Sequence, residues 1–229
     1  MGLTTEAAHD LPRAVDPLNA EWVTVVLLAM LLLLALINVN SPRKWRLLGQ
    51  SMFRMRLGKQ ALREEMDLQD RAFLGLLLVG TTVLALFGWQ FMTVSGASSV
   101  FPVLAMVVIG VVLGNYVLLR IVGALMRSTQ GADEYLYTGF LIFILAGVVL
   151  LPVVVFVAYR SAWRPGALMV GWSLVVVLLL YRWIRGAWIG VGEGIPLRYI
   201  ILYFCAAELM PILLGIQHWR NTPSLLSHI

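Results

Sequence analysis

Apolar runs of bilayer-spanning length set what this chain can fold into. Six of them follow one another, covering about residues 22–39, 72–94, 102–125, 135–158, 167–183 and 199–216. Crossing the hydrocarbon core takes about 20 apolar residues per helix. Across the chain 60% of residues are hydrophobic and 13% charged, whereas soluble domains are about 45–50% apolar and about 25% charged. The sequence therefore predicts an all-α, polytopic membrane protein with six transmembrane helices.

The segments between the runs are short, which leaves no independent soluble domain. We predict a single membrane domain over residues 22–216, flanked by a polar N-terminal tail (1–21) and a C-terminal tail (217–229). The N-terminal tail is acidic, unlike the basic start of a cleaved signal peptide, so the first run is expected to remain as an anchor. No internal repeat indicates a duplicated transporter fold.

The longest polar connection, residues 41–71, is strongly basic. Apolar side chains recur in it at helical spacing, with cations on the other side, which is typical of a helix lying on the membrane surface. We predict an amphipathic surface helix that contacts lipid or a partner through Trp45, Arg46, Met52 and Arg54. A solvated linker and a docking segment for a cytoplasmic partner are the alternatives. The basic residues are Arg43, Lys44, Arg46, Arg54, Arg56, Lys59, Arg63 and Arg71.

The distribution of Lys and Arg orients the runs. With residues 41–71 in the cytoplasm, 13 of the 17 basic residues lie on that side and 4 on the other (13 + 4 = 17). Because basic loops favour the cytoplasmic side, we predict that both termini lie outside. Beyond the eight residues above, the cytoplasmic set is Arg120, Arg127, Arg182, Arg185 and Arg198, and the outer set is Arg13, Arg160, Arg164 and Arg220.

The last run contains a carboxylate, Glu208, near its middle, and Pro211 three residues later. A charged residue at the bilayer centre costs roughly 2.5–3.5 kcal/mol, so Glu208 is expected to face a partner helix or a wet cavity. At about 1.5 Å rise per residue, polar residues of the second and third runs reach a similar depth. The predicted intramembrane polar site comprises Glu208, Pro211, Asn115, Arg120, Thr81 and Thr82.

This polar site has three possible roles. Glu208 could be a hydrogen-bonded packing device that fixes helix register, a proton or cation relay in a polar cavity, or a contact for a partner's membrane helix. Pro211 frees the carbonyl of Ala207 from its helical hydrogen bond and thereby supplies an acceptor beside the carboxyl group.

Other local patterns predict how the helices pack and connect. Gly110 and Gly114, one turn apart, predict a close-packing face, and Pro152 predicts a kink in the fourth span. Residues 127–134 are predicted to form a tight polar loop, and the glycine-rich residues 185–198 a flexible interfacial link rather than a nucleotide-binding loop.

Signals for catalysis are absent from the sequence. His9, His218 and His228 all lie in the tails, and Cys205 is the single cysteine, so neither a haem nor a metal site is expected. No hydrolase or metalloprotease motif occurs. We therefore predict no enzyme activity and no cofactor. We also predict no nucleic-acid partner, because the basic residues cluster beside apolar runs.

The C-terminal part contains Tyr181-Arg182 and, at residues 202–211, Leu-Tyr-Phe-Cys-Ala-Ala-Glu-Leu-Met-Pro. This pattern resembles an uncharacterised bacterial family of small multi-pass inner-membrane proteins with a domain of unknown function, found mainly in Bacteroidetes. Its members end in a similar helix, so the resemblance extends to Leu202, Tyr203, Cys205, Glu208 and Pro211. It implies a role for Glu208 and Pro211 but no particular activity.

Together these patterns favour a non-catalytic scaffold or assembly subunit of a cell-envelope complex in the bacterial inner membrane. The alternative is a proton-coupled carrier or channel for a small solute that uses Glu208. The expected partners are the lipid bilayer and other membrane or envelope proteins, with a homo-oligomer as a further arrangement.

Overall fold

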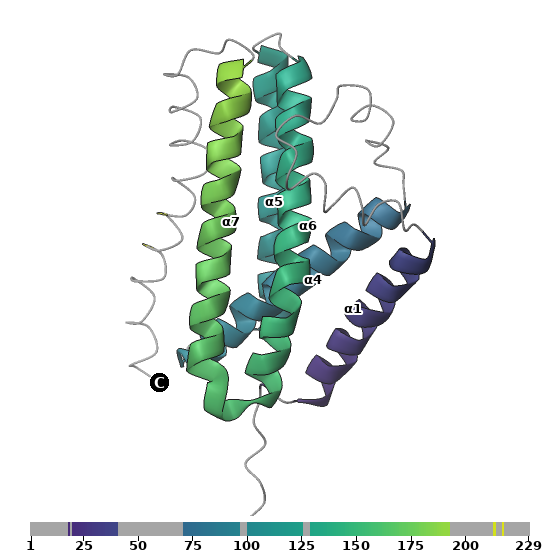
Figure 1. The fold of residues 1–229 in the computed structure, drawn as a ribbon, viewed down its shortest axis with the longest axis vertical. Coiled ribbons are helices and arrows are strands. Elements are labelled where there is room, and N and C mark those ends of the chain that lie inside the picture. Colours follow the sequence, from purple (N-terminus) through teal and green to yellow (C-terminus); the bar gives the residue numbers. More distant parts are fainter. Residues whose placement is uncertain are drawn as a thin grey trace, which may run out of the picture.

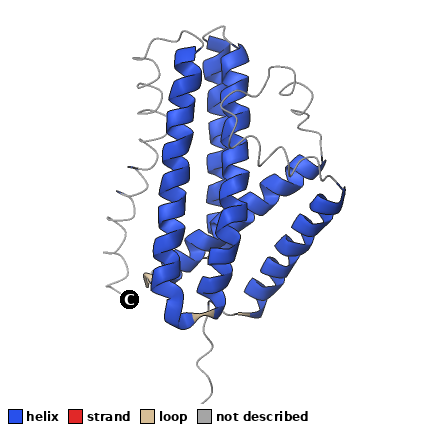
Figure 2. Ribbon diagram, viewed as in Figure 1, coloured by secondary structure: helices blue, strands red, loops and turns tan. Residues whose placement is uncertain are grey.

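The computed structural model describes residues 20–40, 71–96, 100–125 and 129–192, together with Leu18, Leu213 and Gln217, and gives the backbone alone at 118–125, 129–138 and 189. Its elements are α1 (Glu21–Asn40), α4 (Arg71–Val94), α5 (Phe101–Leu125), α6 (Thr129–Tyr159), the 3₁₀ turn η2 (Ser161–Trp163) and α7 (Arg164–Gly192). Figure 2 shows helices and no strand over these residues, which confirms the predicted all-α class.

Four of the described segments are long and apolar enough to cross a bilayer: Glu21–Asn40, Arg71–Val94, Gly139–Tyr159 and Ser161–Gly192. Helix α5 adds a shorter apolar stretch, Phe101–Val117. The predicted sixth run (199–216) lies outside the described residues apart from Leu213, as does the predicted surface helix (41–71) apart from Arg71. The described helices thus support a membrane protein.

Helix α6 is the centre of the described fold. It packs against α4, α5 and α7, whereas α1 packs against α4. Figure 1 shows α5, α6 and α7 running along the long axis, with α4 crossing them obliquely and α1 at one edge. Because α4 and α6 have neighbours on several sides, half of each span is buried (50% and 56%), against 17% for the α1 and α7 segments.

Two glycines bring α4 and α6 into contact at their crossing. A Cβ atom built on Gly147 would overlap the Cα of Gly80, and one built on Gly80 would lie 3.3 Å from the Cα of Ile144. Val79 and Val83, next to this contact, are fully buried. In lipid, helices associate through close van der Waals packing rather than through release of water, and small residues permit this approach.

Helix α7 is held to α4 by an aromatic side chain that fits over a glycine. A Cβ built on Gly171 would lie 2.5 Å from Cε2 of Phe87, and the Phe87 side chain is 4% exposed. Trp172 packs edge-on against Phe87 and Phe91, with ring centroids 6.2 and 5.2 Å apart. The missing side chain of Gly171 therefore creates the space that the Phe87 ring fills.

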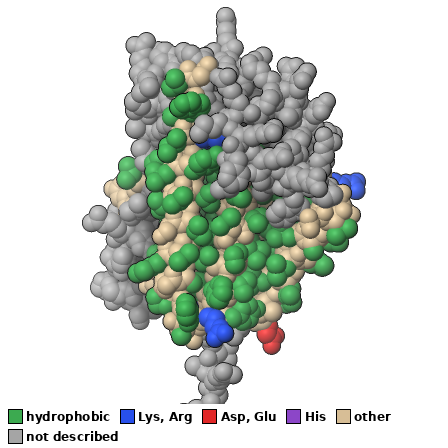
Figure 3. All heavy atoms as spheres, viewed as in Figure 1, with side chains coloured by type: hydrophobic (Ala, Val, Ile, Leu, Met, Phe, Trp, Pro, Cys, Tyr) green, Lys and Arg blue, Asp and Glu red, His purple; other side chains and the backbone are tan. Residues whose placement is uncertain are grey.

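The outer surface is apolar, with polar and aromatic groups at one end. Figure 3 shows hydrophobic side chains over most of the described surface in that view. At the end where α6 meets α7, Trp163 is exposed and the hydroxyl of Tyr159 donates a hydrogen bond to Oγ1 of Thr24 (2.8 Å). Trp22 packs on Trp89 with ring centroids 4.8 Å apart. Such an aromatic group is typical of a membrane–water boundary.

Two connections predicted to be irregular are helical over their described residues, where these predictions were wrong. Helix α6 begins at Thr129, inside the predicted loop 127–134, and α7 continues to Gly192, through much of the predicted link 185–198. Adding residues to an existing helix requires no new nucleation, so a helix can extend beyond the apolar run that started it. Gly186 and Gly190 are buried in this extension despite their low helix propensity.

Helix α6 continues through Pro152, where the sequence predicts a kink. Pro152 is exposed, so its ring lies on the outer side of the helix. After α4 the chain turns at residues 95–96, and Gly96 adopts a φ of 77°, a left-handed conformation that suits glycine at a helix end.

Candidate functional site

The described part of the chain contains some of the residues of the predicted intramembrane polar site. Thr81 satisfies its hydroxyl within its own helix, donating to the carbonyl of Leu77 (2.8 Å), and Thr82 is half-buried on α4. Asn115 lines a pocket on α5. For Arg120 the backbone alone is described, and the other predicted residues lie outside the described part: Glu208, Pro211, Trp45, Arg46, Met52 and Arg54.

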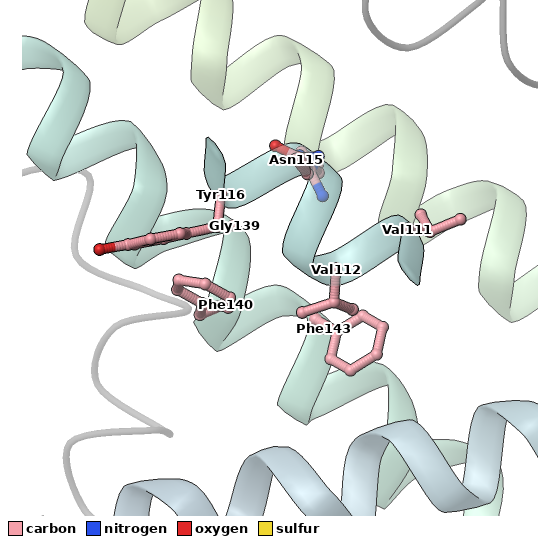
Figure 4. A pocket seen from close by; sticks show the side chains of 8 residues that line it. Val111, Val112, Asn115, Tyr116, Gly139, Phe140 and Phe143 are labelled. Atoms are coloured by element: carbon pink, nitrogen blue, oxygen red, sulfur yellow. The ribbon is translucent and has the colours of Figure 1, made fainter. Parts of the chain in front are cut away.

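The pocket at Asn115 is formed where α5, α6 and α7 meet, and it has a volume of about 60 Å³. One water molecule needs roughly 10–15 Å³ of such space, so several waters or a small polar group fit. In Figure 4 the Tyr116 and Phe140 rings lie close to each other, and Val112 and Phe143 form a neighbouring apolar pair. The lining residues are Val111, Val112, Asn115, Tyr116, Gly139, Phe140, Phe143 and Arg182.

The charged group of this pocket is the guanidinium of Arg182. It lies over Gly139, such that a Cβ built on that glycine would be 3.7 Å from its Cζ and Nη2 atoms. Arg185, one turn further along α7, is 8% exposed, and its Nη1 donates to the hydroxyl of Tyr181 (3.4 Å). Helix α7 therefore places cationic groups against α6, where glycine leaves room for one of them.

The pocket lies about one bilayer thickness from the aromatic end of the bundle. The stretch Gly139–Tyr159 has 21 residues and is about 30 Å long at 1.5 Å per residue. On α7, Arg182 lies about 27 Å from Arg164. Since a hydrocarbon core is about 30 Å thick, the α6 and α7 residues of the pocket lie about that far from the aromatic end.

The sequence predicts Asn115 as a site residue but not Arg182. Arg182 contributes only to the predicted orientation and, with Tyr181, to the family resemblance. The sequence signal for Arg182 is its spacing from Arg185. The two arginines lie one turn apart at the C-terminal end of an apolar run. What the sequence could not supply is that Gly139, on another helix, provides the space beside Arg182.

Gln90 is a second buried polar side chain that sequence reasoning did not select. It is fully buried on α4, and its Nε2 donates to the carbonyl of Val154 on α6 (3.1 Å), while its Oε1 makes no hydrogen bond. Its hydrogen bond links the two central helices near their C-terminal ends, Val94 of α4 and Tyr159 of α6.

Replacing Gln90 by leucine is expected to change the free energy of unfolding modestly. Interhelical hydrogen bonds in membranes contribute about 0.6 kcal/mol on average and about 1.7 kcal/mol at most, and the change also removes an acceptor without a hydrogen bond. Equilibrium unfolding in mixed detergent and sodium dodecyl sulfate measures the difference. A loss above about 3 kcal/mol would show that Gln90 does more than this one contact.

Among the described residues, no group of three or more His, Cys, Asp or Glu side chains could hold a metal ion. The predicted absence of cofactor and catalysis stays a prediction.

Comparison with known proteins gives one family. A family model described as a domain of unknown function, DUF4271, matches residues 23–218, which includes the helices described above except the first two residues of α1. No curated protein matches the chain, and no solved structure does. The match confirms the predicted resemblance to a family with a domain of unknown function, while its Bacteroidetes distribution and C-terminal motif stay predictions. The chain therefore belongs to the DUF4271 family, a domain of unknown function.

Proposed function

We propose that this chain is a non-catalytic scaffold or assembly subunit of a cell-envelope complex in the bacterial inner membrane. In this proposal six helices cross the membrane, both termini lie outside, and residues 41–71 contact lipid or a partner on the cytoplasmic side. The segments of spanning length in the described part and the excess of basic residues on one side support this arrangement.

The observation that carries the proposal is the outer face of α5. Gly110 and Gly114 are exposed, and a Cβ built on either would meet no atom within 4 Å. This is the face that the sequence predicts to pack closely, yet within the described part the close helix contact uses Gly80 and Gly147 instead. Exposed apolar residues continue the face at helical spacing: Val103, Met106, Val107, Leu113 and Val117.

A glycine-lined face of this kind is suited to a second membrane helix. Two small residues one turn apart allow helix backbones to approach, which increases dispersion contacts in lipid. If this face were covered only by lipid, its glycines would make fewer contacts with the acyl chains than larger side chains would. The face therefore favours a role in which the protein associates with another membrane protein.

Leucine at Gly110 and Gly114 is expected to abolish this association. The parent, extracted from native membranes, should purify with a membrane protein at fixed stoichiometry, and the double variant should lose that partner. Gly88→Leu is the matched control, since a Cβ at Gly88 also meets no atom within 4 Å. Retention of the partner by the double variant would exclude this face as the binding site.

The alternative function, a proton-coupled carrier or channel using Glu208, is favoured by the polar pocket at Asn115. The same preparation tests it. A protein that purifies alone and gives pH-dependent solute flux in vesicles, abolished by Glu208→Gln, would replace the scaffold proposal. A scaffold should show no flux and should tolerate Glu208→Gln.

A further inference from the structure

We propose that the pocket between α5, α6 and α7 binds the phosphate headgroup of an anionic phospholipid. This inference does not depend on the scaffold function, since it concerns a different face of α5 and a different ligand. The pocket combines a cation, an amide and aromatic rings with an apolar rim.

The depth of the pocket matches that of a lipid headgroup. Gly139 and Arg182 lie about 30 and 27 Å along their helices from the end marked by Tyr159 and Arg164. This distance is close to the thickness of the hydrocarbon core, so the guanidinium lies where phosphates of the nearer leaflet are found. Basic pockets between transmembrane helices are a known way of holding anionic headgroups.

The side chains offer suitable hydrogen-bond donors. A guanidinium has five N–H donors in a planar fork that matches two phosphate oxygens, so Arg182 can bind a phosphate and keep the interaction that it already makes. The Asn115 amide adds a neutral donor from α5. Gly139 leaves room for the guanidinium, which lies 3.7 Å from the position of a Cβ atom on that glycine.

The rim of the pocket favours a lipid over a free ion. Val111, which lines the pocket, is 63% exposed. An acyl chain can therefore lie against α5 at Val111 while its phosphate enters the pocket. A free phosphate would gain the polar contacts alone.

Lipid binding by the full-length protein tests the proposal. Native mass spectrometry of the detergent-purified protein should show retained phosphatidylglycerol and much less phosphatidylcholine. Arg182→Gln should lower the phosphatidylglycerol affinity about tenfold, the effect of losing a charge-assisted hydrogen bond. Arg160→Gln is the matched control, because it removes an exposed arginine at the opposite boundary and should leave the affinity unchanged.

The glycine beside Arg182 provides a test that leaves the charge in place. Gly139→Ala should bind lipid as the parent does, since its Cβ makes ordinary contact at 3.7 Å. Gly139→Leu should fill the pocket and lower the affinity about tenfold. If a variant does not fold, the lipid preference of the parent protein still tests the proposal. Equal retention of phosphatidylglycerol and phosphatidylcholine by the parent would overturn it.

Inorganic phosphate separates a headgroup site from a site for a soluble anion. Millimolar phosphate is expected to leave phosphatidylglycerol bound, because it lacks the acyl contacts. If phosphate alone binds the lipid-free protein through Arg182 and displaces the lipid, the site serves a soluble anion and the lipid proposal fails. Parental retention of phosphatidylglycerol by folded Arg182→Gln would overturn it as well.

Discussion

Alanine at Gly147 is expected to be the most destabilising methyl-sized change among the described glycines. The added Cβ would overlap the Cα of Gly80, and because this neighbour is backbone, no side-chain rotation can make room. The α4–α6 crossing must open, with loss of packing around fully buried Val79, Val83 and Ile144. Overpacking costs about 1–3 kcal/mol and occasionally more; we expect at least the upper part of this range.

Gly110→Ala is the matched control for this prediction. It makes the same chemical change in a membrane helix, but its Cβ meets no atom within 4 Å. In detergent-purified protein it should be neutral, or slightly stabilising because alanine is the better helix former. Sodium dodecyl sulfate unfolding followed by circular dichroism compares the two. If Gly147→Ala and Gly110→Ala unfold at the same detergent fraction, the close contact of α4 with α6 does not hold the fold together.

Alanine at Gly171 is expected to weaken the attachment of α7 by about 1–3 kcal/mol. Its Cβ would lie 2.5 Å from Cε2 of Phe87 and 3.1 Å from Cγ1 of Val153. The Phe87 ring is buried and packs against Trp172, so it has little room to move. The loss should be smaller than at Gly147, since a side chain can adjust further than a backbone.

A second substitution distinguishes this clash from a general intolerance of alanine. Phe87→Leu shortens the side chain that would meet the new methyl group. On this background Gly171→Ala should cost less than in the parent, with a coupling energy of about 0.5–3 kcal/mol in a double-mutant cycle. Additive losses would mean that the Phe87 ring does not occupy the space at Gly171.

These two contacts also hold the candidate lipid site in place. The pocket takes Gly139 and Phe143 from α6 and Arg182 from α7; α6 packs against α4, and α7 packs against α6 and contacts α4 through Phe87. Variants that open either contact are therefore expected to lower phosphatidylglycerol retention indirectly. For this reason Arg182→Gln and the Gly139 pair, which change the pocket alone, are the sharper tests of binding.

The sequence by itself determined where the helices are. Apolar runs of spanning length coincide with α1, α4, α5 and with most of α6 and α7, because a membrane requires long apolar segments whose backbones are satisfied internally. It also predicts Asn115 as a site residue, and in the structure Asn115 lines the pocket between α5, α6 and α7. The apolar runs do not predict the start of α6 or the end of α7. Hydropathy detects only the apolar part of a helix, and an existing helix can extend beyond that part without new nucleation.

Tertiary structure alone decided which small residues face which neighbours. Gly110 and Gly114 have the stronger packing spacing in sequence, yet they lie on the outer face, and Gly80 and Gly147 form the contact. Hydropathy fixes the length and depth of a membrane helix but leaves its rotation about its own axis open, because lipid and protein interiors are equally apolar. That rotation placed Arg182 over Gly139 and beside Asn115, and so created the pocket.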